Sequence, residues 1–382
     1  MVVGVVAGHY IWTNTKTLKS TATANRFGAF HVSHSGGGYS FSYGGSVPGL
    51  PSSGSGGASS NGGSSSSTSN VSSAITGKVD PGLVDINTNL GYQDGAAAGT
   101  GMVVSSSGEI ITNNHVIVGA TTISATDLGN GKTYTAHVVG YDYGHDVAVL
   151  QLVDASGLKT VSFGDSSSLK VGQSIDTIGN AGGTGGTPSA ATGQISALNQ
   201  SLTAGDDLDG SSEHLTGMVK LNGDLEPGDS GGPLVNSSGD VVGMDTAALS
   251  SYEFGSSSGQ GFAIPIDAVK TIASEIVAGQ SGDTLHIGAT PFLGVDIESS
   301  TSGSSATGVE VQEAIAGEPA AAAGLAPDDV ITAIDGTSVS SPSALTDQIL
   351  QHQPGDTIQI SYQTTSGSRH TASITLASGP PQ

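Results

Sequence analysis

Residues 226–234 read EPGDSGGPL and place Ser230 inside a turn that is rich in glycine. Acyl transfer to a serine hydroxyl needs a base, an acid that orients the base, and backbone N–H groups aimed at the developing oxyanion. Gly228 suits the last need, because glycine lets the backbone approach closely and permits the positive φ that points successive N–H groups inward. Few structural needs call for Gly-Asp-Ser-Gly-Gly in one tight turn, so this stretch predicts a serine nucleophile.

Two further segments supply candidate partners for that serine. The words TNNHVI and HDVAVLQL place His115 just after a strand and Asp146 at the opening of an apolar strand. Each segment alone is a weak signal, since such a histidine is usually structural and such an aspartate is usually a solvated turn residue. The order His115, Asp146, Ser230, with each residue on a loop beside a strand, favours a catalytic triad. We expect His145, next to Asp146, to be a solvated neighbour.

The surrounding pattern predicts a β-rich first unit over residues 80–280. Short β-branched runs alternate with Gly, Asn, Asp and Ser turns, and this spacing is typical of an all-β sandwich or barrel. One stretch, IDAVKTIASEIVAG over 266–279, has helical spacing, starts after Pro265 and ends at Gly279. The predicted strands lie in the words GMVV (101–104), EIITNNHVIV (109–118), TAHVVGYD (135–142), DVAVLQLV (146–153), GQSIDTIGN (172–180) and DVVGMDT (240–246).

Composition removes several classes of function. The 382 residues include 10 Lys and Arg against 33 Asp and Glu, for a net charge of −23. A field this negative repels phosphate backbones and anionic lipid surfaces, so we expect no nucleic-acid partner. The absence of cysteine excludes disulfides, thiolate metal sites and cysteine nucleophiles. Glycine shows no three-residue period, which excludes collagen.

The first part of the chain differs in texture from the rest. Residues 1–12, MVVGVVAGHYIW, are apolar but shorter than the roughly 20 residues that a spanning helix needs. No basic region precedes them, as a secretory signal would require. Two interpretations stay open: a frayed apolar tail, or the outer end of a membrane anchor or signal whose beginning is missing. Residues 13–79, with the Ser/Gly tract of 52–69, are expected to be a disordered tether.

A second unit is expected over residues 288–378. Short apolar runs there predict strands, including PFLGVDI (291–297) and DTIQISYQT (356–364). The run SALTDQILQHQ (343–353) has helical spacing and ends before a proline. The pattern therefore predicts a small α+β domain.

The first unit resembles the chymotrypsin-fold serine proteases and, within them, the HtrA/DegP branch. The resemblance implies two six-stranded β-barrels with the site between them. It implies His115 as general base, Asp146 as orienting acid and Ser230 as nucleophile, with the backbone N–H groups of Gly228 and Ser230 as oxyanion hole. The matching words are AAGTGMVVSSSGEIITNNHVI, HDVAVLQL, DTIGNAGG, GDLEPGDSGGPLVNSSGDVVGMDTA and the HtrA-like GQGFAIPID.

The sequence departs from that family at two aspartates. HtrA enzymes usually carry Asn where this chain has Asp229, and the sequence leaves the role of Asp229 open. Asp224 lies six residues before Ser230, where the trypsin branch places the acid that selects Arg or Lys. The S1 pocket therefore has two possible forms: a charged one with Asp224, or the small apolar HtrA form built from Leu225 and Met244.

The second unit resembles a bacterial PDZ domain through the words GVEVQ, EPAAAAGLAPDDVITAIDG and PGDTIQISYQ. PDZ domains bind peptide ends by strand addition, with a backbone nest that holds the carboxylate. The carboxylate loop of the family maps to Phe292, Leu293, Gly294 and Val295. A plain strand start with core side chains is the alternative interpretation of these four residues.

Together the two resemblances imply an extracytoplasmic, ATP-independent serine endopeptidase that a PDZ domain regulates. The family implies unfolded or damaged polypeptides as substrates, C-terminal peptides at the PDZ domain, and a homo-oligomer, most simply a trimer. We expect neither a cofactor nor a metal ion. Two alternatives remain: a catalytically silent chaperone or scaffold of the same fold, and a specific processing protease with basic P1 preference.

Overall fold

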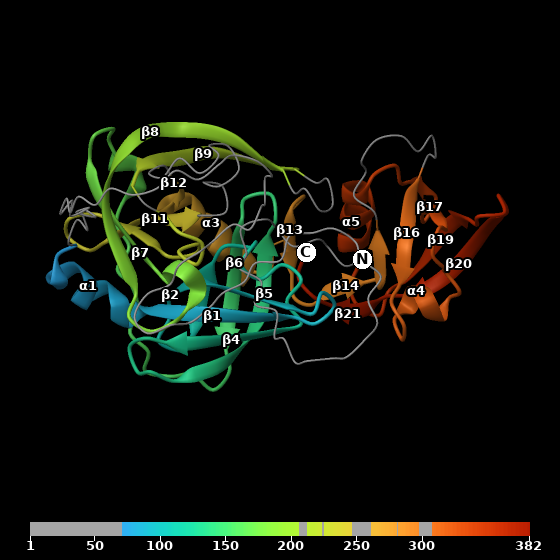
Figure 1. The fold of residues 1–382 in the computed structure, drawn as a ribbon, viewed down its shortest axis with the longest axis horizontal. Coiled ribbons are helices and arrows are strands. Elements are labelled where there is room, and N and C mark those ends of the chain that lie inside the picture. Colours follow the sequence, from blue (N-terminus) through green and yellow to red (C-terminus); the bar gives the residue numbers. More distant parts are fainter. Residues whose placement is uncertain (1–70, 206–211, 224, 247–260, 281, 298–307) are drawn as a thin grey trace, which may run out of the picture. The chain divides into compact units, whose positions relative to one another are not determined.

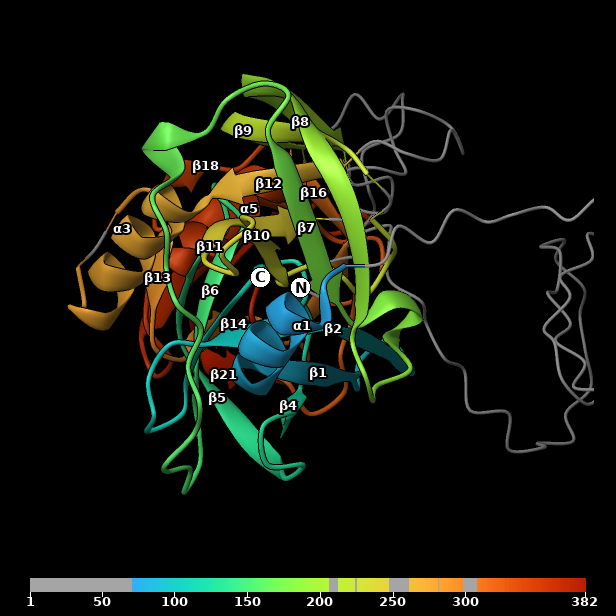
Figure 2. The same cartoon turned by 90° about the vertical axis from the view of Figure 1, so that its left-hand side faces the viewer.

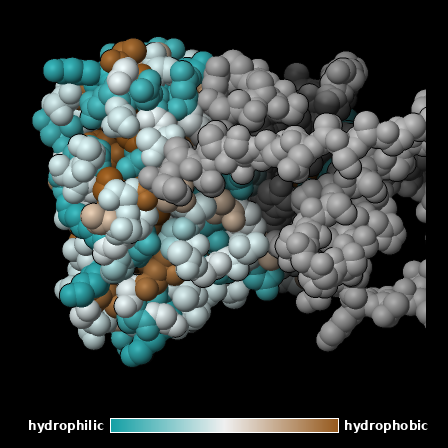
Figure 3. Space-filling view, turned by 60° about the vertical axis from the view of Figure 1, so that its left-hand side comes forward, coloured by the Kyte–Doolittle hydropathy of each residue, from teal (hydrophilic) through white to brown (hydrophobic). Residues whose placement is uncertain are grey.

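The computed structural model describes residues 71–205, 212–223, 225–246, 261–280, 282–297 and 308–382 (Figure 1). The apolar tail of residues 1–12 and the Ser/Gly tract lie outside this part of the chain. Asp224 also lies outside the described residues. In the described ranges, no helix combines the length and the apolar character that a membrane crossing requires. On the face drawn in Figure 3, hydrophobic residues form small separate patches among polar ones.

The first β-barrel closes through the pairing of strands β5 and β6, in the order β5-β4-β1-β2-β3-β6. Alternate side chains along β3 and β6 point to opposite faces, as the period of a strand requires. Ile110 and Leu150 belong to the barrel interior, whereas Ile111 and Val149 belong to the core shared with the second barrel. The strands are β1 Leu83–Leu90, β2 Gly95–Val103, β3 Glu109–Thr112, β4 Thr122–Asp127, β5 Thr133–Asp142 and β6 Val147–Leu152.

The second barrel is also closed and has six strands, in the order β10-β11-β12-β9-β8-β7. Figure 2 shows β7, β8 and β9 curving side by side along one side of it. Two closed barrels confirm the predicted chymotrypsin-like double barrel. The strands are β7 Ser174–Gly179, β8 Ser189–Gly205, β9 Ser212–Asn222, β10 Pro233–Val235, β11 Val241–Thr246 and β12 Gly261–Pro265, with short 3-10 turns η2 Ser166–Ser168 and η3 Ala181–Gly183.

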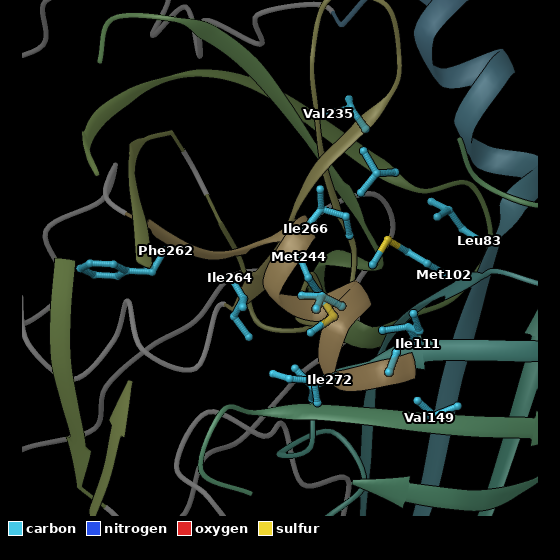
Figure 4. Packing of buried hydrophobic residues seen from close by; sticks show 14 of the residues in the cluster. Leu83, Met102, Ile111, Val149, Val235, Met244, Phe262, Ile264, Ile266 and Ile272 are labelled. Carbon is cyan, nitrogen blue, oxygen red and sulfur yellow. The ribbon is translucent and has the colours of Figure 1, made fainter. Parts of the chain in front are cut away.

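Helix α3, Ile266–Val277, joins the two barrels through its apolar face. Its buried residues share one cluster with Ile111 and Val149 of the first barrel and Met244 and Ile264 of the second (Figure 4). The predicted helix therefore exists, and the chain leaves it at Gly279 with φ +67°, a conformation that glycine adopts without strain. Because this cluster contains residues of both barrels, it packs the two barrels against each other and against α3.

The folded unit begins before residue 80. Helix α1, Ser73–Val79, is capped by Ser72, whose hydroxyl accepts a hydrogen bond from the Ala74 N–H at 3.3 Å. Lys78 Nζ lies 2.7 Å from Asp240 Oδ1, and Val79 is 2% exposed. The last residues of the predicted tether thus form a helix that packs on the turn between β10 and β11. A short 3-10 turn, η1 Asp80–Gly82, leads from it into β1.

The second unit has its own core and its own sheet. The strands run in the order β15-β16-β17-β19-β20, with β18 beside β17, and β14 pairs with β21. Between the two units, β13 Leu285–Ile287 pairs with β5 and extends the sheet of the first barrel. The elements are β14 Thr290–Phe292, β15 Val295–Ile297, β16 Val309–Ala314, α4 Pro319–Ala322, β17 Val330–Ile334, β18 Thr337–Ser338, α5 Pro342–Leu350, β19 Thr357–Gln363, β20 Arg369–Thr375 and β21 Ala377–Gly379.

Candidate active site

His115 and Asp146 form a buried hydrogen-bonded pair. The Nδ1 atom of His115 lies 3.0 and 2.9 Å from the two carboxylate oxygens of Asp146. The backbone N–H of His115 donates to Asp146 Oδ1 at 3.0 Å. The two residues are 5% and 1% exposed. Because Nδ1 is engaged by the carboxylate, Nε2 is left as the ring atom that can exchange a proton with a nucleophile.

Local contacts force Asp146 into this position. Its backbone has φ +56°, a left-handed conformation that aspartate tolerates better than most residues. The side chain of Asn113 donates to the Asp146 carbonyl at 3.0 Å, and the Thr246 hydroxyl donates to Asp146 Oδ2 at 3.3 Å. Thr246 ends β11, so the second barrel supplies one of the groups that orient the acid of the first.

The loop that carries Ser230 packs against the end of β2 beside the histidine. The N–H of Thr100 donates to the Ser230 carbonyl at 2.9 Å. A Cβ added at Gly99 would lie 2.7 Å from Val116, the residue after His115, and 3.3 Å from the Ser230 carbonyl oxygen. Only a glycine at this point lets the histidine segment and the serine loop approach the same strand. The segment that follows His115 and the loop that carries Ser230 therefore both pack against Gly99 and Thr100 of β2.

The serine loop contains two glycines with positive φ whose surroundings leave no room for a side chain. Gly228 has φ +101°, and a Cβ there would lie 2.1 Å from the Asn180 carbonyl oxygen. Its own carbonyl accepts a hydrogen bond from the Thr100 hydroxyl at 2.8 Å. Gly231 has φ +84°, and a Cβ added there would lie 2.1 Å from the Thr100 carbonyl oxygen. These glycines are required by space and by conformation, as the motif predicts.

Asp229, whose role the sequence left open, is tied down within its own neighbourhood. Its Oδ2 accepts a hydrogen bond from the Glu226 N–H at 2.9 Å, and its Oδ1 accepts one from the Ser189 hydroxyl at 3.2 Å. Burial, only partly offset by these two donors, raises the pKa of Asp229 to about 6. The carboxyl of Asp229 is thus held by two uncharged donors, the Glu226 N–H and the Ser189 hydroxyl.

The two apolar residues predicted for the S1 pocket, Leu225 and Met244, lie in different surroundings. Leu225 stacks on Gly261 of β12, where an added Cβ would meet the leucine side chain at 2.3 Å. Met244 is fully buried in the core between the barrels and packs with Ile264 and helix α3 (Figure 4). That placement argues against Met244 as part of a pocket wall. His145 is an exposed neighbour as expected, and its Nδ1 lies 2.8 Å from Asp142 Oδ2.

Sequence reasoning missed two threonines that hold the site together. Thr100 binds three parts of it: its hydroxyl donates to the Gly228 carbonyl and accepts from the Asn180 N–H at 2.9 Å, and its N–H donates to Ser230. Thr246 orients Asp146. Thr100 lies in the motif AAGTG and Thr246 in the motif GMDTA. A threonine in a strand does not indicate such a role unless its hydrogen-bond partners are known.

The predicted carboxylate loop of the second unit is buried and sharply turned. Gly294 has φ +77°, and an added Cβ would lie 2.2 Å from Glu318 Cβ. Its carbonyl accepts from the Ile315 N–H at 2.9 Å. Phe292, Leu293 and Val295 are all buried in or beside the core of this unit. A small cavity of about 10 Å³ lies between Leu293 and residues Ile349 and Leu350 of α5.

Comparisons with known proteins find a known domain in each of the two units. A trypsin-like peptidase domain matches residues 99–244, and a PDZ domain matches residues 291–376. These matches confirm the two resemblances drawn from the sequence.

Named relatives extend over both domains. The chain is 34% identical over 318 residues to serine protease PepD of Mycobacterium tuberculosis, covering 79% of this chain and 65% of the relative. It is 33% identical over 272 residues to the periplasmic pH-dependent serine endoprotease DegQ of Escherichia coli, covering 69% of this chain and 55% of the relative. The chain thus spans between half and two thirds of these relatives. A solved HtrA-type protease, AlgW with decapeptide, is 26% identical, with coverage of 82% and 100% and a TM-score of 0.45.

Proposed function

We propose that this chain, a relative of the HtrA and DegP serine proteases with a trypsin-like peptidase domain and a PDZ domain, is an active serine endopeptidase. The observation that carries the proposal is the buried pair of His115 Nδ1 and the Asp146 carboxylate beside the Ser230 loop. A scaffold that does not catalyse hydrolysis does not require an oriented imidazole beside a serine flanked by glycines.

The mechanism follows from these positions. His115 takes the proton of the Ser230 hydroxyl as the oxygen attacks a peptide carbonyl, and Asp146 stabilises the imidazolium that forms. The backbone N–H groups of Gly228 and Ser230 stabilise the oxyanion of the tetrahedral intermediate. His115 then gives its proton to the leaving amine, and water hydrolyses the acyl-enzyme with the same base.

A fluorophosphonate probe tests the proposal, because it reacts with a serine only when a neighbouring base activates it. We expect covalent labelling of the wild type and none of Ser230→Ala or His115→Ala, read as a mass shift on intact protein. His145→Ala, which changes an exposed neighbour, serves as the control that keeps its labelling. A folded wild type that takes no label would support the catalytically silent scaffold instead.

The substrates and setting are inferred from the relatives. One relative is named a periplasmic endoprotease, which supports an extracytoplasmic location for this chain. We infer unfolded or damaged polypeptides as substrates and a homo-oligomeric assembly, as the family resemblance implies. The high acidity of the chain favours solubility in such a compartment.

The PDZ domain is proposed to bind C-terminal peptides at residues 292–295 and to regulate the protease. One solved relative is described with a decapeptide. At Gly294 a methyl group would meet Glu318 and the φ of +77° would be strained. We expect Gly294→Ala to weaken binding of a fluorescent peptide with an apolar C-terminus by about tenfold or more, which corresponds to about 1.4 kcal/mol.

Fluorescence polarisation measures this change, and Gly336→Ala is the matched control. Gly336 has φ +80° in the same domain, but a Cβ there meets nothing within 4 Å. Equal affinities of the Gly294→Ala variant and this control would place the peptide elsewhere in the domain.

A further inference from the structure

Asp245 is a completely buried carboxyl that the proposed mechanism does not use. Its exposed fraction is 0%, and neither carboxyl oxygen has a hydrogen-bond partner among the described residues. Burial, with a smaller contribution from the charge of Asp229, raises the pKa of Asp245 well above its usual value. A carboxylate in such a place would lack any compensating donor, which costs far more free energy than burial of the neutral acid.

The backbone of Asp245 holds the residues that directly follow the nucleophile. The N–H of Gly231 donates to the Asp245 carbonyl at 2.9 Å, and the N–H of Asp245 donates to the Gly232 carbonyl at 2.8 Å. Gly232 in turn donates to the Asp229 carbonyl at 2.8 Å. Any shift of Asp245 is therefore transmitted to the loop that shapes the oxyanion hole.

Strand pairing shows which way the Asp245 carboxyl points. Asp245 lies directly opposite Ala263 on β12, so the two side chains share one face. Ala263 belongs to the apolar cluster inside the second barrel, and Leu225 packs against that cluster. The next residue, Thr246, points to the other face and contacts Asp146. The Asp245 carboxyl is thus directed to the face of β11 on which the apolar cluster of the second barrel lies.

Within the described ranges, the charged groups around β11 give Asp245 no cation. Asp229 is the charged group that acts on it, and its effect is to raise the pKa of Asp245. The other titratable groups described on elements near β11 include Glu226 on the serine loop, Asp240 on the turn before β11 with its partner Lys78, Asp165 after the segment that bridges Val241, Asp176 on β7, Lys220 on β9, Asp267, Lys270 and Glu275 on α3, and the His115–Asp146 pair beyond Thr246. Lys220 lies over the Phe262 ring at 5.7 Å.

We propose that Asp245 is a positioning residue for the nucleophile loop, and that the loop keeps its catalytic form only while the Asp245 carboxyl carries a proton. The inference rests on the proposed protease function. Asp229 titrates near pH 6, and its charge then opposes ionisation of Asp245. When pH rises further and Asp245 ionises, the carboxylate must reach water or donors. This movement shifts the backbone of Asp245, and its hydrogen bonds to Gly231 and Gly232 carry the shift to the loop.

The direction of the pH effect follows from the raised pKa values. Both carboxyls bind protons more tightly in the folded chain than in the unfolded chain. Folding stability therefore falls as pH rises from about 4 through their folded-state pKa values. On the acid side, activity needs a neutral His115 to accept the proton of Ser230. The proposal thus predicts a bell-shaped profile whose alkaline limb belongs to Asp245.

The rate of fluorophosphonate labelling, followed from pH 5 up to the pH at which the wild type unfolds, tests this assignment. For the wild type we expect a rate that falls on the alkaline side by about tenfold per pH unit, the slope of a single titrating group. Asp245→Asn keeps the shape of the neutral acid and cannot ionise, so we expect its rate to stay level there. The matched control is Asp127→Asn, which changes another buried carboxyl whose pKa burial raises, in the first barrel.

A second variant moves the limb the opposite way. Asp229→Asn removes the charge that opposes ionisation of Asp245, so we expect its alkaline limb at lower pH than in the wild type. A merely structural role of Asp245 would produce neither shift. An unchanged limb in both variants would overturn the assignment. Absence of labelling in the wild type at every pH would instead count against the protease function itself.

Discussion

Replacing Asp146 by asparagine should lower kcat/KM for peptide hydrolysis by about 10⁴-fold while the chain stays folded. The carboxylate contacts His115 Nδ1 through both oxygens, at 3.0 and 2.9 Å, and so selects the tautomer in which Nε2 is the proton acceptor. An amide at this position presents a donor to the ring and favours the wrong tautomer. The backbone of Asp146, held by Asn113 at 3.0 Å, is unaffected by the change.

Hydrolysis of a denatured protein substrate and of a short fluorogenic peptide measures the loss. Circular dichroism and urea unfolding check that the two barrels persist. His145→Ala is the comparison, because it alters a histidine–aspartate contact one residue away whose imidazole is 57% exposed, and we expect activity close to wild type. Retention of a tenth or more of the activity by Asp146→Asn would contradict the role given to this acid.

The sequence predicts the double barrel, and it marks Ser230 as a candidate nucleophile, because both signals are local in the chain. Alternating apolar residues between Gly and Asn turns indicate strands without reference to the rest of the chain. The motif around Ser230 carries its own reason, since Gly228 and Gly231 sit where the backbones of Asn180 and Thr100 leave no room for a Cβ. Residues whose role is set by their own backbone can be recognised from sequence.

Roles set by distant partners could not be predicted in the same way. Met244 is an apolar residue in the same family motif as Ser230. Its side chain nevertheless packs with helix α3 and Ile264 in the core between the barrels. Asp245, its neighbour, points to the opposite face and gains a role that depends on Asp229 and Ala263. The helix of residues 73–79 is missed because its stability comes from Lys78 and Val79 packing on a turn 160 residues away.

The glycine at position 228 gives the second large effect. In Gly228→Ala the new Cβ would lie 2.1 Å from the Asn180 carbonyl oxygen and 2.8 Å from the Gly183 nitrogen, both backbone atoms that cannot turn aside. The loop must therefore shift, and one of the two N–H groups assigned to the oxyanion hole moves with it. Loss of one such donor typically costs about 10²–10³-fold in kcat. We expect a loss of at least this size, in kcat more than in KM.

Steady-state kinetics on a fluorogenic peptide separates the two constants, and Gly172→Ala provides the matched comparison. Gly172 also has a positive φ, +83°, in the second barrel, but a Cβ there meets nothing within 4 Å. Both variants carry the strain of a non-glycine residue at positive φ, and only the first carries the clash. A Gly228→Ala variant whose kcat matches that of Gly172→Ala would show that the oxyanion is stabilised by donors other than this loop. The donors that stabilise the oxyanion would then have to be other groups near Thr100, such as those of the Asn180 segment that its hydroxyl binds.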